Sequence, residues 1–298
     1  MRLKVFKLLL FIAILLSSLL LSCNSNTKSM FKADNGVEFN TINFEKEHFL
    51  DNNPENPSCN LTLNLVYPNS IANFDSQTAK RVFLRTVIGA DYDSLSAQEA
   101  VDKYAQNYIN NYQSDAEIYK INKPTQKQSN DDLYLTEDDQ AYLPEIFYSY
   151  YENISDSIVY NQYGIISFKV KQTNNKGGRM SYETNRNYVL DLSNGELITE
   201  SDIFSAGYDM ALRPIIQNSL MEANNVKSIQ ELEDLGFFGI DEILPNKNFL
   251  ITDKGIIYTF NKGEYSAYQL QAPEIFIPYG VIRSLLREGS IAFKLSKL

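Results

Sequence analysis

The sequence predicts an α+β fold, with a largely antiparallel sheet, packed helices and two intertwined or adjacent halves. Three observations support this fold class. Several segments alternate apolar with polar residues, as strands with one buried face do. Other segments carry apolar residues at helical spacing, and two pairs of strand-like segments flank turns that contain glycine. Hairpins interspersed with helices are typical of α+β proteins, whereas parallel sheets require regularly alternating strands and helices.

The first half contains one clear strand followed by two helices. Residues 61–66 alternate leucine with other residues up to Pro68, and this pattern predicts a half-buried strand. Residues 74–90 carry apolar residues at helical spacing and predict a helix. Ser96 and Glu99 have the spacing of a capping box, which indicates that another helix begins there.

The tyrosines of this second helix allow two interpretations. Tyr104, Tyr108 and Tyr112 share one stripe with Val101, so they form either part of the core or a face that stacks against a ligand. At this spacing we expect core positions. The polar residues 120–140 that follow predict a connection between the two halves.

The second half is richer in strands, and its glycines predict two hairpins. Segments 166–170 and 188–192 flank a turn at 174–178, whose glycines tolerate the positive φ of tight turns. Segments 249–252 and 256–260 flank a second turn. The remaining expected elements are a helix at 208–220 with Pro214 inside it or at its first turn, a strand at 274–277 and a helix at 281–286.

The amino terminus predicts export and lipid anchoring. Residues 1–22 combine three cations with an apolar run of about 14 residues, shorter than the roughly 20 that span a bilayer. The run ends at Leu20-Leu21-Ser22-Cys23, which resembles the bacterial lipobox, whose cysteine is acylated after cleavage before it. An ordinary secretory signal is the alternative. We expect a lipid on Cys23, an envelope location with the outer membrane favoured by Asn24, and a tether over 23–56.

Composition excludes some partners and some covalent chemistry. The chain has 27 basic and 37 acidic residues, and such an acidic protein repels the phosphates of nucleic acids. If Cys23 carries lipid, Cys59 is the only thiol left, so no intramolecular disulfide forms and Cys59 is expected to be a small buried residue. We expect a monomer that contacts the membrane through its lipid.

The inventory of reactive residues argues against an enzyme. His48 is the only histidine, so the sites of zinc hydrolases and of histidine-dependent serine hydrolases are not expected, and His48 is interpreted as a solvated side chain. No cofactor motif and no metal-ligand set is apparent. Paired acids remain an alternative, since 231–234 and Asp241-Glu242 offer carboxylates for glycan hydrolysis.

Several short motifs of the second half resemble the extracytoplasmic family DUF3298 over roughly residues 175–295. The family often has Ala-His-Gly after its double glycine, where this chain has Arg179-Met180-Ser181. A later glycine of the family is missing around 271–273. Residues 61–68 resemble the partner domain DUF4163. The motifs that carry the DUF3298 resemblance are Gly177–Met180, Tyr188–Thr199, Asp202–Phe204, Asn248–Thr252, Gly255–Asn261, Glu264–Tyr268 and Ile275–Tyr279.

The resemblance implies two domains, 57–150 and 151–298, with an α+β fold. Such domains occur in the outer parts of bacterial anti-sigma factors, one branch of which binds lysozyme, and beside polysaccharide deacetylases. The first hypothesis is therefore a non-catalytic domain that binds a lysozyme-like protein or a cell-wall glycan, with Glu264, Tyr265 and Tyr268 as candidate ligand-binding residues. The alternatives are a carboxylate-dependent glycan hydrolase and a structural lipoprotein.

Overall fold

The computed structural model describes residues 34–72, 74–122, 148–177 and 180–298. The expected signal peptide, the lipidation site Cys23, the first part of the expected tether and most of the connection 120–140 lie outside the described residues. The expected α+β fold with a mostly antiparallel sheet is confirmed. Among the described residues, no helix combines the length and the hydrophobicity needed to cross a membrane.

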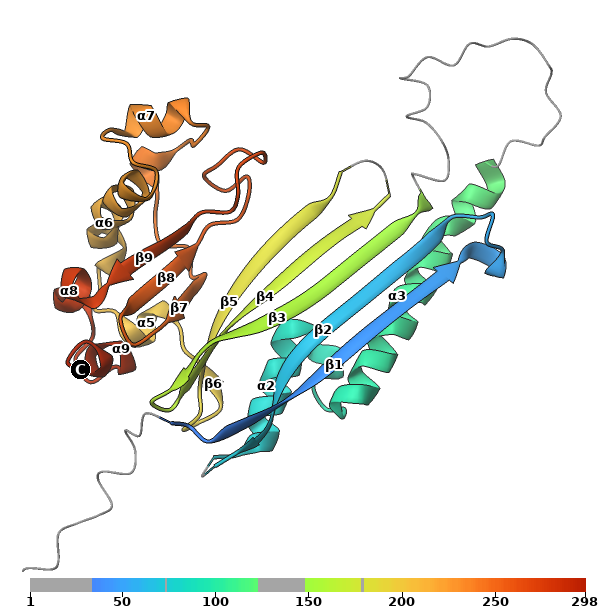
Figure 1. The fold of residues 1–298 in the computed structure, drawn as a ribbon, viewed down its shortest axis with the longest axis horizontal. Coiled ribbons are helices and arrows are strands. Elements are labelled where there is room, and N and C mark those ends of the chain that lie inside the picture. The colour runs from blue at the N-terminus through green and yellow to red at the C-terminus, as the bar shows by residue number, and fades with distance from the viewer. Residues whose placement is uncertain (1–33, 73, 123–147, 178–179) are drawn as a thin grey trace, which may run out of the picture.

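A six-stranded sheet runs through the middle of the molecule (Figure 1). Its strands follow chain order, and all neighbours are antiparallel except β2 and β3, which are parallel. Alternating side chains give the sheet one apolar and one polar face. The strands are β1 (Val37–Phe49), β2 (Ser58–Ile71), β3 (Tyr150–Gln162), β4 (Ile165–Lys176), β5 (Tyr182–Asp191) and β6 (Glu196–Leu197).

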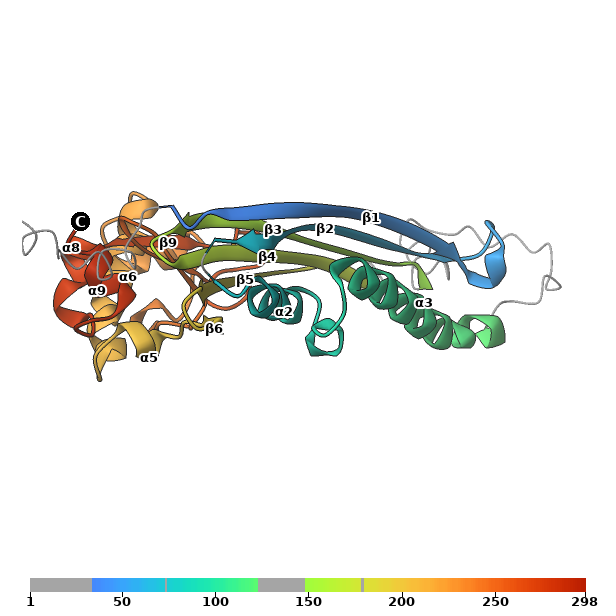
Figure 2. The ribbon, with the colours of Figure 1, turned by 90° about the horizontal axis from the view of Figure 1, so that it is seen from below.

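Two helices, α2 (Ser76–Val87) and α3 (Ala97–Asn122), cover the apolar face, as Figure 2 shows. The expected capping box is confirmed, because the Glu99 N–H donates to Ser96 Oγ and the Ser96 N–H donates to Glu99 Oε2 at 3.0 Å. The helices enclose a core in which the rings of Phe83 and Phe168 lie 5.1 Å apart. Burying each large apolar side chain of this kind stabilises the fold by roughly 1.5 to 3 kcal/mol.

The C-terminal lobe packs a three-stranded sheet against short helices and has its own core. Pro214 lies inside α6, six residues after its start, rather than in its first turn. The expected helix at 281–286 is instead one α-turn and one 3-10 turn, because Ile282 leaves helical geometry at φ −111° and ψ 3°. The elements are α5 (Glu200–Ile203), α6 (Tyr208–Ala223), α7 (Ile229–Asp234), η4 (Ile240–Glu242), β7 (Phe249–Ile251), β8 (Gly255–Thr259), β9 (Glu274–Pro278), α8 (Tyr279–Ile282), η5 (Arg283–Leu285) and α9 (Ile291–Leu295).

The strands cross two of the boundaries expected from the sequence. The expected tether 23–56 contains β1, a 13-residue edge strand that pairs with β2 along its whole length. The expected boundary at residue 150 does not separate two sheets, because β3 pairs directly with β2 and both halves contribute to one core. The structural division falls instead after β6, where the chain leaves the large sheet for the C-terminal lobe.

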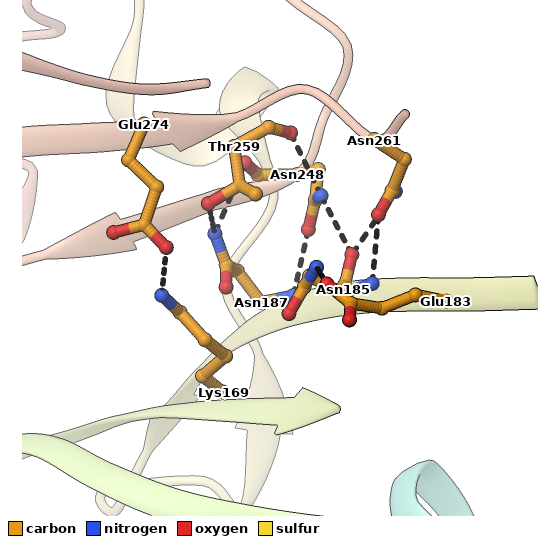
Figure 3. Close-up of polar contacts among 8 residues, drawn as sticks. All are labelled: Lys169, Glu183, Asn185, Asn187, Asn248, Thr259, Asn261 and Glu274. Atoms are coloured by element: carbon orange, nitrogen blue, oxygen red, sulfur yellow. Dashed lines mark hydrogen bonds and ion pairs between the residues drawn. The ribbon is translucent and has the colours of Figure 1, made fainter. Parts of the chain in front are cut away.

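Asparagine side chains join the lobe to the outer edge of β5 (Figure 3). The Asn187 N–H donates to Asn248 Oδ1 at 2.7 Å, and Asn248 Nδ2 donates to the carbonyls of Asn185 and Thr259 at 2.9 and 2.8 Å. The Asn185 N–H donates to Asn261 Oδ1 at 2.7 Å. These amides occupy the places that a neighbouring strand would take, so they satisfy an edge that the short β6 leaves open.

A second set of contacts fixes the lobe to β4. Ser167 Oγ donates to the Ile251 carbonyl at 2.6 Å, and Lys169 forms an ion pair with Glu274 (Figure 3). Ile165, on the same face of β4, belongs to the core of the lobe. The lobe therefore covers the polar face only near β4 and β5, and Figure 1 looks onto the open remainder of that face.

Candidate functional site

A groove lined by five tyrosines lies between α3 and the ends of β3 and β4. We call it the tyrosine groove. Its cavity volume is about 150 Å³. The tyrosines alternate with amides and charged groups, a combination that offers both apolar faces and hydrogen-bonding groups. The lining residues are Tyr92, Tyr104, Asn107, Tyr108, Asn111, Tyr112, Asp115, Tyr150, Glu152 and Lys176.

Glu152 is the buried acid of this groove, with 6% of its surface exposed. It lies on β3 two residues before Ile154 and points to the apolar face, where an unpartnered carboxylate would be costly. Tyr104 Oη donates to Glu152 Oε2 at 2.8 Å, and Gln172 Nε2 donates to Oε1. Burial and the nearby Glu152 charge raise the pKa of Tyr104, so its hydroxyl keeps the proton that it donates.

The helix positions the remaining groups because residues three and four apart share one side of α3. Asn107 Nδ2 donates to Tyr92 Oη at 3.0 Å, and the Tyr92 ring meets the Tyr104 ring edge-on at 5.4 Å. Tyr108 lies half-buried one turn further, and burial raises the pKa of its hydroxyl above the usual range. These contacts hold the rings in place before any ligand arrives, which lowers the entropy cost of binding.

A second cavity of about 220 Å³ adjoins the groove at Tyr104, which lines both. We call it the arginine cavity. Its lining residues are Arg85, Thr86, Val87, Ile88, Gly89, Tyr104, Ile154, Gln172 and Arg186.

A larger cavity of about 450 Å³ lies between the start of α2 and the turn before β6, and we do not assign a site to it. Asp75 caps α2 there by accepting from the Gln77 N–H at 3.0 Å and from Thr78 Oγ1. This carboxylate already satisfies the helix end and would repel an anion. The remaining lining is mostly the turn 192–195, and Phe74 is the one aromatic residue that lines this cavity.

The loop predicted to bind ligand is tied into the lobe. Glu264 accepts from the Asn261 N–H at 2.9 Å and from Asn246. Tyr265 packs against the core, with its ring edge-on to Phe260 at 5.4 Å. Tyr268 is 59% exposed. Glu264 and Tyr268 are thus exposed while Tyr265 packs inward, and the structure does not bring the three residues to the tyrosine groove.

Three other residues singled out in the sequence, His48, Cys59 and Glu231, make contacts that serve the fold. His48 is half-buried on β1, with Gln113 Nε2 3.0 Å from its Nε2, and is not the solvated side chain expected. Cys59 is buried as expected, and burial raises its thiol pKa to about 12, which suppresses reactivity. Glu231 lies in the first turn of α7, and its carboxylate accepts from the Lys227 N–H at 2.9 Å.

The sequence identified Tyr104, Tyr108 and Tyr112 as core residues, and these rings do pack against the core. The sequence analysis did not identify the groove residues Tyr92, Tyr150 and Glu152, or the neighbouring Gln172 and Arg186. The sequence does contain a signal for Glu152. This acid lies two residues before Ile154 and interrupts the apolar side of a strand. Arg186 breaks the apolar side of β5 in the same way, two residues before Tyr188. Their proximity depends on strand register and cannot be read from the sequence alone.

Comparison with protein families matches residues 201–280 to the model described as "Protein of unknown function (DUF3298)". The chain carries a DUF3298 domain. The match covers α5 to β9 of the C-terminal lobe, so the resemblance noted in the sequence is confirmed there. The tyrosine groove lies outside the matched residues. The DUF4163 resemblance of the first half stays a prediction.

Two crystal structures of DUF3298 proteins share the fold. One, from Bacteroides fragilis, has 23% identity and a TM-score of 0.77, with 90% of this chain and 100% of that chain covered. The other, from Pseudomonas aeruginosa PAO1, has 10% identity and a TM-score of 0.55, with 84% and 95% covered. At these identities the likeness establishes the fold alone. No curated protein matches the chain.

Proposed function

We propose that this DUF3298 protein is an envelope lipoprotein that binds a cell-wall glycan in its tyrosine groove without cleaving it. The observation that carries the proposal is the combination of preorganised tyrosine rings, asparagine amides and a buried carboxylate in one groove. Rings pack against the apolar faces of sugars, and amides and carboxylates bond their hydroxyls. The lipobox resemblance ending at Cys23 supports the envelope location.

The hydrogen bonds of Glu152 favour a non-catalytic role. Both of its oxygens already accept hydrogen bonds, from Tyr104 and Gln172. This arrangement holds the group as a fixed acceptor, whereas a glycosidase acid must release a proton to the leaving oxygen. Glycan hydrolysis is therefore the second candidate, and product analysis during the binding experiment distinguishes it.

We expect Tyr108→Ala to weaken binding of a peptidoglycan disaccharide fragment on the order of tenfold, because about 1 to 1.5 kcal/mol of ring contact is lost. Titration calorimetry with the mature chain measures this change. Tyr268→Ala, which removes an exposed tyrosine outside the groove, is the matched control and should leave the affinity unchanged. No saturable binding, or binding to lysozyme but not to the fragment, would contradict a glycan ligand. Cleavage of the fragment would contradict a non-catalytic role.

We expect Cys23→Ala to abolish lipid attachment, because acylation in the lipobox requires the thiol. Metabolic labelling with a fatty-acid analogue measures this directly, and the label should disappear from the variant. Cys59→Ala is the control, since the other cysteine is buried in the fold and should not change the labelling. Full labelling of Cys23→Ala would show that the anchor lies elsewhere or is absent.

A further inference from the structure

Arg186 is a half-buried cation in the arginine cavity that lacks an acidic partner among the described residues. Its only hydrogen bond there runs from Nη2 to Gln172 Oε1 at 3.4 Å, and its buried Nε has no partner. Arg85 lines the same cavity but is neutralised, since its Nε donates to Asp93 Oδ2 at 2.8 Å. Buried guanidinium groups are normally paired, so Arg186 has unused capacity for an anion.

Gln172 lies between the Arg186 guanidinium and the Glu152 carboxylate and bonds to both. Its Oε1 accepts from Arg186, while its Nε2 donates to Glu152. The three side chains lie on adjacent strands of the same sheet face, because Gln172 is opposite Ile154 and Arg186 is opposite Val170. A purely structural pair would bring guanidinium and carboxylate into contact. Here the Gln172 amide separates them, so that Glu152 lines the tyrosine groove and Arg186 lines the arginine cavity.

Space and shape favour a carboxylate at Arg186. A planar guanidinium binds a carboxylate through two parallel hydrogen bonds, and the Arg186 side chain lines the cavity. The cavity adjoins the tyrosine groove at Tyr104. One ligand can therefore lay its sugar ring in the groove and its acidic group in the arginine cavity.

We propose that Arg186 binds the carboxylate of the ligand, so that the groove selects an acidic, carboxylate-bearing sugar or glycopeptide over a neutral sugar. This inference rests on the proposed glycan function and specifies its ligand class. Gln172 and Tyr104 act as positioning residues, because they hold Arg186 and Glu152 in their separate places.

N-acetylmuramic acid and N-acetylglucosamine make a matched pair of probes, since they differ only in the lactyl group that carries the carboxylate. We expect the mature chain to bind the acidic sugar roughly 10- to 100-fold more tightly, the effect of a charge-assisted bond. Arg186→Gln should remove this preference and leave binding of the neutral sugar unchanged. Arg283→Gln, an exposed arginine on the C-terminal lobe, should keep the preference. Equal affinities in the parent chain, or a preference that survives in Arg186→Gln, would overturn the inference and leave glycan binding standing.

A second measurement tests Arg186 without any sugar. Titration with sodium D-lactate should shift the Arg186 Nε–Hε signal in NMR spectra to saturation, whereas sodium chloride at equal ionic strength should not. Circular dichroism checks that Arg186→Gln folds. If neither sugar binds but lactate shifts the signal, the carboxylate site stands and the glycan function fails. If lactate moves the signal no more than chloride does, Arg186 is not a carboxylate site.

Discussion

Replacing Asn248 by leucine is expected to lower the free energy of unfolding by about 3 to 5 kcal/mol, although the two side chains have similar size. The amide of Asn248 serves three backbone groups at the seam between β5 and the C-terminal lobe: the Asn187 N–H and the carbonyls of Asn185 and Thr259. Leucine leaves the Asn187 N–H without its acceptor. It also removes one of the two side-chain hydrogen bonds to each carbonyl, because Asn261 Nδ2 also donates to Asn185 and Asn246 Nδ2 also donates to Thr259. A buried group without a partner costs about 1 to 3 kcal/mol.

Urea denaturation followed by circular dichroism measures this loss. Asn64→Leu is the matched control, since Asn64 is exposed on the open face of β2 and its change should stay within about 0.5 kcal/mol. Equal stabilities of Asn248→Leu and the parent chain would show that the asparagine seam does not hold the lobe to the sheet.

Replacing Asp156 by asparagine is expected to stabilise the protein above neutral pH by up to about 4 kcal/mol. Burial raises the pKa of Asp156 to about 7 and outweighs the hydrogen bond that its Oδ1 accepts from the Val66 N–H at 2.8 Å. In the unfolded chain the pKa of aspartate is about 3.9. The unfolded state therefore releases this proton first, and the free energy of unfolding falls as pH rises from about 4 through 7.

Asparagine keeps an oxygen that accepts from Val66 and does not ionise, so the variant should lose this part of the pH dependence. Unfolding curves at pH 5 and pH 8 measure the difference for both proteins. Asp91→Asn, at an exposed position, should leave the pH dependence of the parent chain unchanged. If the free energy of unfolding of the parent chain does not fall between pH 5 and pH 8, the raised pKa of Asp156 is contradicted.

Periodicity predicted most of the fold because one face of each element is buried. The alternation around Phe168 and around Tyr188 identified two strands, and the structure pairs these residues directly. The strand β1 was missed for a physical reason. It is an edge strand with a bulge between Glu38 and Phe39, and the run from Glu45 to Glu47 is charged, so its burial pattern is weak.

The candidate site was harder to predict than the fold. The helical spacing predicted the stripe through Tyr104 and Tyr108. Both rings are half-buried, so each packs against the core on one side and lines the groove on the other. Glu152, Gln172 and Arg186 come from three strands, and only the register places them side by side. A polar residue at an apolar position of a strand is the signal that sequence offers, and it does not say which partner lies opposite.

The position of a bound glycan fragment tests the account most directly. Amide chemical shifts of the mature chain, followed by NMR during titration with a peptidoglycan disaccharide fragment, locate the contact surface. We expect saturable changes confined to residues around the tyrosine groove and the arginine cavity, centred on Tyr104, Tyr108 and Glu152. Changes centred on Glu264 to Tyr268, or on the open polar face of the sheet, would contradict the assignment of the groove as the binding site.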